Sequence, residues 1–203
     1  MSVTAERVTV PLADAPDDLA TLAFGHGVDR LSLTACPGLG HLLEADLGTP
    51  GPVLRSAAGR VDVDYPHLGV LRRAHPSSIS LDSRVTWTIE VSGGAHDVDA
   101  DLTTARLAAL RFAGGVTGLA LVLDAPDGPT TVEADWLDDA TIRRPRGVDV
   151  RVEVSGHARG LTVDGRHLGH ASELALQSAF YNEAAPGYLI RLGQAIAVNV
   201  EVL

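Results

Sequence analysis

Apolar residues recur at an interval of 21 residues between Val85 and Gly165, and this spacing is the main structural signal in the sequence. Two series share the interval: Val98, Leu119, Ala140 and Leu161, and two residues further on, Ala100, Leu121, Ile142 and Val163. A repeat near 20 residues is too short for two helices with their turns and is typical of one coil of a stacked β structure. We therefore expect positions 98, 119, 140 and 161 to touch in a column.

Glycine-rich residue pairs mark the corner of each predicted coil. The pairs Gly93-Gly94, Gly114-Gly115, Asp135-Trp136 and Gly156-His157 keep the same interval. Glycine reaches backbone angles that other residues adopt only at a cost, so these pairs predict bends between two short strands. The segment Leu107–Leu110 is in phase with the strand that precedes it by one interval, which favours a strand over a helix there.

The N-terminal third carries weaker copies of the pattern. The step from Phe24 to Leu31 equals that from Val91 to Val98 and predicts an earlier coil, and alternating residues predict strands over 7–10, 42–47 and 59–65. Residues 66–80 and 169–187 break the pattern, and their path is not predicted. Residues 165–169 are interpreted as a turn, 172–177 as either helix or strand, and 188–203 as a closing strand.

These observations together predict an all-β fold with a single domain over residues 1–203. The expected architecture is a single-stranded parallel, right-handed β-helix or solenoid with coils of about 21 residues. Residues 1–80 would form irregular coils, and residues 81–203 the regular coils with the closing strand.

Composition excludes several classes of function. The net charge of −10 argues against non-specific binding to nucleic acid, and none of the 16 basic residues is a lysine, which excludes Schiff-base chemistry. The single cysteine, Cys36, cannot form an internal disulfide and is expected to be a buried structural thiol. With no secretory leader and no long apolar stretch, we expect a cytoplasmic protein without membrane insertion.

The sequence resembles the bacterial putative-adhesin domains and the C-terminal domains of LiaF-type envelope-response proteins, also called toastrack domains. The resemblance rests on the segments 87–95, 114–119, 144–148, 152–156 and 188–191, and covers residues 85–203 best. It implies a parallel β-helix that serves as an interaction or sensory module. The absence of an expected membrane segment distinguishes this chain from membrane-attached relatives and makes a cytoplasmic scaffold or ligand-binding role equally reasonable.

The best candidate ligand-binding residues lie near the end of the repeat. They comprise His157, His167 and His170, with Asp164 between them, and Arg143 and Arg144 from the one basic cluster, which also includes Arg146 and Arg151. Arginines of this kind can bind an anionic partner through paired hydrogen bonds, although they also offset neighbouring acids such as Asp149. No metal site and no cofactor is predicted, because no further ligand lies at a suitable spacing.

A second candidate is the acidic series Asp97, Asp99 and Asp101. These carboxylates could bind a divalent cation, but one interval further on they are replaced by Gly118, Ala120 and Val122, so a solvated strand face is favoured. An enzymatic alternative would combine Asp97 or Asp99 with His96 and with Arg143 or Arg144 in a groove along one face.

The sequence therefore favours a non-enzymatic bacterial interaction, scaffold or sensory module. Its expected partner is another protein or a second copy of itself, bound at an end or a face of the stack. The alternative is an enzyme or small-ligand-binding protein that uses acidic and histidine residues in a groove. A deep cleft holding titratable side chains from adjacent coils would favour the enzyme, and a flat apolar face or exposed strand edge would favour the scaffold.

Overall fold

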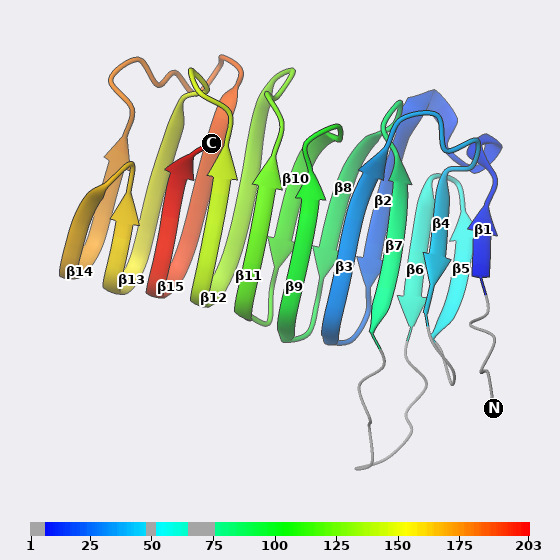
Figure 1. The fold of residues 1–203 in the computed structure, drawn as a ribbon, viewed down its shortest axis with the longest axis horizontal. Coiled ribbons are helices and arrows are strands. Elements are labelled where there is room, and N and C mark those ends of the chain that lie inside the picture. Colours follow the sequence, from blue (N-terminus) through cyan, green and yellow to red (C-terminus); the bar gives the residue numbers. More distant parts are fainter. Residues whose placement is uncertain (1–6, 48–51, 65–75) are drawn as a thin grey trace, which may run out of the picture.

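The computed structural model describes residues 7–47, 52–64 and 76–203, which form one sheet of 15 strands (Figure 1). Two short 3-10 turns, η1 (Leu12–Asp14) and η2 (Pro16–Asp18), follow the first strand. The strands are β1 (Arg7–Val10), β2 (Leu19–Phe24), β3 (Val28–Cys36), β4 (Leu43–Asp46), β5 (Val53–Ala57), β6 (Arg60–Asp64), β7 (Ser77–Asp82), β8 (Thr86–Val91), β9 (Ala95–Leu102), β10 (Arg106–Phe112), β11 (Val116–Leu123), β12 (Pro129–Arg144), β13 (Val150–Val163), β14 (Arg166–Gln177) and β15 (Gly187–Val202).

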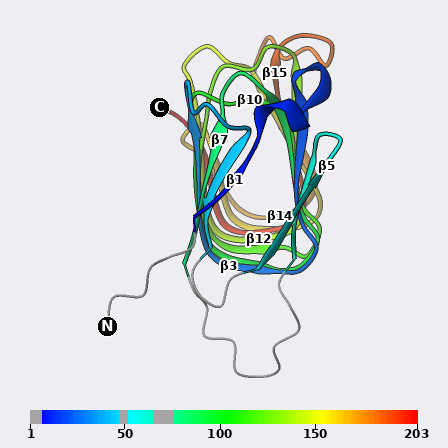
Figure 2. The ribbon, with the colours of Figure 1, turned by 90° about the vertical axis from the view of Figure 1, so that its right-hand side faces the viewer.

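The sheet folds into a trough that is U-shaped in section, with loops across its open side (Figure 2). One arm of the U contains β2, β6, β8 and β10, and the other contains β3, β7, β9 and β11. The long strands β12, β13, β14 and β15 run through the bend and belong to both arms. The sheet thus nearly closes on itself, and one core of apolar side chains fills the space between the arms.

Strand register confirms most of the predicted columns. Val98 lies opposite Leu119, and Leu119 lies opposite Ala140, at the predicted 21-residue interval. The earlier copy is also confirmed, because Phe24 lies opposite Val91 in the parallel pair of β2 and β8. The segment Leu107–Leu110 is part of strand β10, as its phase predicts.

The predicted corners coincide with the bend of the trough, where the backbones of neighbouring strands approach closely. A Cβ atom on Gly93 would lie 2.2 Å from the backbone nitrogen of Gly27, and one on Gly114 would lie 2.3 Å from the carbonyl carbon of Gly93. A Cβ on Gly193 would lie 2.2 Å from the carbonyl oxygen of Asp135. Real Cβ atoms do not approach backbone this closely, so glycine is required by packing.

A second column of unusual residues lies three to four positions further on, where the second arm begins. Its members share left-handed backbone angles, with φ between 50° and 72°: Arg30, Asp97, Gly118, Asp139, Ala197 and Gly160. Glycine adopts this conformation freely, and aspartate tolerates it better than most residues. The recurrence of Asp97 and Asp139 in phase with two glycines therefore reflects backbone geometry.

The predicted purely parallel β-helix is wrong, because the sheet is mixed. At one end β1 pairs antiparallel with β4, β4 with β7, and β5 with β6; at the other end β13 pairs antiparallel with β14. Two-residue turns with positive φ at both positions, Ala58-Gly59 and Asp164-Gly165, reverse the chain. The predicted turn over 165–169 is accordingly wrong beyond Gly165, because β14 begins at Arg166, and residues 172–177 are strand.

The order of the last strands also differs from the sequence order. Strand β15 lies between β12 and β13, so Val198 faces Ala140, and Leu161 is one strand further away from Ala140 than expected. Alternating charges on the outer face accompany this order: Arg191 of β15 contacts Glu133 of β12 at 3.3 Å and Glu153 of β13 at 3.4 Å. Placing β13 directly beside β12 in the same register would set these two glutamates against each other.

Candidate functional site

The candidate site is a shallow hollow of about 430 Å³ at the bend of the trough, between β15, β13 and β14. Its lining residues are His157, Ala158, Arg159, His170, Ala171, Ser172, Gln194 and Ile196. Gln194 and Ile196 come from β15, which is separated from β13 by β14 in the sequence but lies next to β13 in the sheet. The site therefore depends on the insertion of β15 beside β13, which the repeat alone did not predict.

Strand pairing places the polar side chains of the hollow next to one another. In the antiparallel pair of β13 and β14, His157 lies opposite Ser172 and Arg159 lies opposite His170. On the other side, Arg159 lies opposite Ile196 of β15. Both pairings of β13 shift register after Val154, and this irregularity occurs at the bend where the hollow lies.

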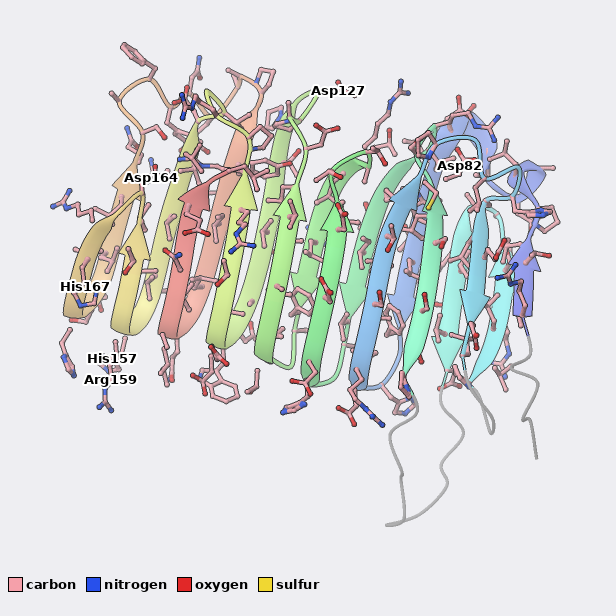
Figure 3. The ribbon with its side chains drawn as sticks, viewed as in Figure 1. Asp82, Asp127, His157, Arg159, Asp164 and His167 are labelled. Atoms are coloured by element: carbon pink, nitrogen blue, oxygen red, sulfur yellow. The ribbon has the colours of Figure 1, made fainter. Side chains whose placement is uncertain are left out.

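The lining of the hollow is rich in hydrogen-bond donors and contains no carboxylate. His157, Arg159 and His170 are all exposed, and Figure 3 shows His157 and Arg159 extending outward from the bend. Within the described part of the chain Arg159 makes no ion pair, whereas Arg111 and Arg191 of the same sheet each contact glutamates. A guanidinium without a partner beside two imidazoles fits an anionic group such as a carboxylate.

The remaining predicted site residues lie outside the hollow. His167 is hydrogen-bonded through Nδ1 to the hydroxyl of Thr162, 3.2 Å away. Asp164 lies in the turn of the β13–β14 hairpin, whereas His157 lies midway along β13 at the bend of the trough (Figure 3). The structure therefore brings His157 and His170 together and separates both from Asp164.

The two predicted arginines are held by acidic partners. Arg143 donates to Glu201 over 2.8 Å, and this hydrogen bond is the main cause that lowers the pKa of Glu201. Arg144 is only 3% exposed and donates to Asp164, which joins the end of β12 to the β13–β14 turn. Its Nε has no hydrogen-bond partner within the described residues. Both arginines are thus engaged in holding strands together.

A polar group that the sequence identified only in part, through His96 and Asp97 but not Asp29, lies at the bend between β3 and β9. Ligand atoms of Asp29, His96 and Asp97 lie within 4.8 Å of one another, and all three residues are exposed. His96 Nδ1 lies 3.4 Å from a carboxylate oxygen of Asp29 and 3.3 Å from one of Asp97, so contacts among these three side chains account for the arrangement. The alignment of β3 with β9 was the available signal, because it sets Asp29 opposite His96.

The residues of the enzymatic alternative are not assembled into one group. Arg143 lies opposite Val122, and Val122 lies opposite Asp101, so Arg143 and the acidic strand β9 are two strand spacings apart, about 10 Å. Arg144 is buried, donates to Asp164 and does not contact Asp97 or Asp99.

Two further polar features lie toward the open side of the trough. A hollow of about 350 Å³ beneath the 124–128 loop includes Arg106 and Asp127, which pair at 3.7 Å. Asp82 is fully buried, and its carboxylate accepts hydrogen bonds from Arg84 Nε and Nη2 at 2.9 and 2.7 Å, the main cause that lowers the pKa of Asp82. Cys36, predicted to be buried, is half-buried.

Comparison with known proteins bears on the fold. No family model matches this sequence, and no curated protein sequence matches it. The fold is similar to the crystal structure of a "putative cell adhesion protein" from Clostridium sporogenes, with a TM-score of 0.72, 15% identity and 98% of each chain covered. This likeness shows that the two proteins share an all-β fold, and it does not single out the LiaF-type family. No helix among the described residues is long and apolar enough to cross a membrane.

Proposed function

We propose that the protein is a non-enzymatic, adhesin-like interaction module that binds an acidic segment of a partner protein. The proposed binding site is the hollow at the bend between β13, β14 and β15, here called the corner hollow. The observation that carries this proposal is the lining of the hollow: His157, Arg159 and His170 converge there without a carboxylate. A partner's aspartate or glutamate would supply the acceptor that Arg159 lacks within the described residues.

The charge of the whole molecule makes such a site selective. With a net charge of −10, the protein repels acidic segments at long range, so binding must come from a local donor cluster. Hydrogen bonds between a guanidinium and a carboxylate are charge-assisted and geometrically specific.

The structural likeness supports an interaction role for this fold. The similar protein carries a description of cell adhesion, which applies to that protein and is transferred here as part of the proposal. Membership of the toastrack family and the cytoplasmic location stay predictions. The separation of Arg143 and Arg144 from the acidic strand β9 gives the enzymatic alternative no comparable support.

Binding of a fluorescently labelled oligo-glutamate peptide, followed by anisotropy at physiological ionic strength, tests the proposal, because a screening length of about 8 Å suppresses the long-range repulsion. We expect Arg159→Gln to weaken binding about tenfold, because it removes one charge-assisted contact worth about 1.4 kcal/mol. Arg146→Gln is the matched control, since Arg146 is exposed in the 145–149 loop and makes no ion pair with described residues. Equal losses in the two variants, or no binding by the unaltered protein, would refute the proposal.

A further inference from the structure

Strand β14 is a long, unpaired edge of the sheet. It has 12 residues, and among the described residues it pairs only with β13. The other edge strands are shorter: β1 has four residues and is followed by Pro11, and β5 has five residues and is preceded by Pro52. Short edges flanked by proline resist pairing with another chain, whereas β14 contains no proline to prevent it.

The inward side chains of β14 form an incomplete layer of core. Leu168, Ala171, Leu174 and Leu176 pack against the core but are only half-buried. The residues opposite them in β13 are completely covered: Leu161, Ala158, Val154 and Val152 are at most 2% exposed. The difference arises because β13 has a neighbour on both sides and β14 on one, so one more strand would complete this layer.

The arrangement of side chains along β14 is symmetric about Ala171. Pairing with β13 assigns residues 166, 168, 171, 174 and 176 to the inward face and residues 167, 170, 172, 175 and 177 to the outward face. Reversal of the strand about position 171 maps the inward set onto itself, and the outward set onto itself except for the terminal residue Gln177. The two positions of β14 at the bend, Gly169 and Glu173, also exchange with each other on this reversal. Gly169 lies opposite Gly160, which has a left-handed backbone conformation, and Glu173 has that conformation itself.

We propose that a second copy of this chain pairs with β14 in antiparallel register, with Ala171 on the two-fold axis. Rotation about an axis through the bend reverses the strand and exchanges the two arms of the U, so the second trough continues the first. Leu168 of each copy then faces Leu174 of the other on the inward face, and Leu176 lies opposite Arg166 at the ends of the paired segment. Such an interface uses the same surface on both copies.

The symmetry argues for a second copy over an unrelated peptide, since a peptide partner needs no palindromic pattern in its receptor strand. The far end of the molecule also argues for a closed dimer. There β1 runs obliquely across the end of the trough (Figure 2), and Leu12 and Ala15 pack against the core. With one end covered, pairing through β14 stops at two copies and does not extend into a fibre.

Disulfide trapping tests this register in a Cys36→Ser background. Residues directly opposite each other in an antiparallel pair have Cα atoms about 4.5–5.5 Å apart, a range that a disulfide can span. We expect Ala171→Cys to give a covalent dimer on mild oxidation, with twice the 21.2 kDa mass of the chain. Ala175→Cys is the matched control, because two such residues would lie eight positions apart, about 25 Å along the ribbon.

Each outcome decides the proposal. Crosslinking at position 171 and not at 175, together with a doubled mass of the unaltered protein by light scattering, supports it. A mass of 21.2 kDa at high concentration, with no crosslink at 171, overturns it, as does equal crosslinking at both positions, which indicates random collision. Thermal unfolding of both variants confirms that they fold. The inference goes beyond binding at the corner hollow, and either can fail while the other holds.

Discussion

At the scale of single residues, a corner position requires glycine for one of two different reasons. At Gly114 the reason is contact, since any side chain would meet the backbone of Gly93. At Gly118 and Gly160 the reason is backbone conformation, and aspartate replaces glycine at the equivalent Asp97 and Asp139. The sequence showed both sets at the same interval, but it did not separate the two causes, and Asp97 was grouped with acidic neighbours instead.

Substituting Gly114 by alanine tests the contact argument. The new Cβ would lie 2.3 Å from the carbonyl carbon of Gly93, and neither backbone can move without disturbing the strands on both sides. We expect Gly114→Ala to lower the free energy of unfolding by about 3 kcal/mol in urea titrations. Gly128→Ala should change it by less than about 0.5 kcal/mol, because no atom lies within 4 Å of its Cβ position. Similar effects of both substitutions would contradict the close approach.

At the scale of strands, the apolar interval predicted the parallel pairs of β9 with β11 and β11 with β12, but not the order of the last strands. In an antiparallel pair the interval between facing residues changes along the strand, from 3 at Val163 and Arg166 to 26 at Arg151 and Gln177, so a search for one fixed interval did not find the β13–β14 pair. The signal for it was local: Asp164-Gly165 is a favoured two-residue hairpin turn. The charges on the outer face fit the order of β12, β15 and β13, because Arg191 of β15 lies between Glu133 and Glu153 and contacts both.

Reversing the charge of Arg191 tests this explanation of strand order. Arg191→Glu would place a third carboxylate between Glu133 and Glu153 on the outer face. We expect a loss of about 1 kcal/mol in the free energy of unfolding, a modest value because Arg191 is half-exposed and solvent screens the repulsion. The loss should shrink in 1 M salt, in which the screening length is about 3 Å. Arg146→Glu, in a loop, should have little effect on the free energy of unfolding. An equal loss in that variant would contradict a specific role for the contacts of Arg191 with Glu133 and Glu153.

At the scale of the whole molecule, the two ends of the trough differ, and this asymmetry determines where the protein can bind. One end has short edges and is crossed by β1, while the other exposes β14 beside the corner hollow. The sequence identified His157 and His170 as candidates, and the structure sets both in the hollow. The sequence did not identify Arg159, Gln194 or the symmetric edge strand β14, because these depend on which strands become neighbours.

The claim that β14 is the associating edge is tested most directly by amide hydrogen exchange, measured by mass spectrometry at low and high protein concentration. Pairing with a second copy places the N–H groups at the free edge of β14 in hydrogen bonds. We therefore expect peptides covering 166–177 to exchange more slowly as protein concentration rises. Peptides covering the edge strand β5 should exchange at the same rate throughout. Exchange of β14 that does not depend on concentration, or equal slowing of both edges, would contradict the account.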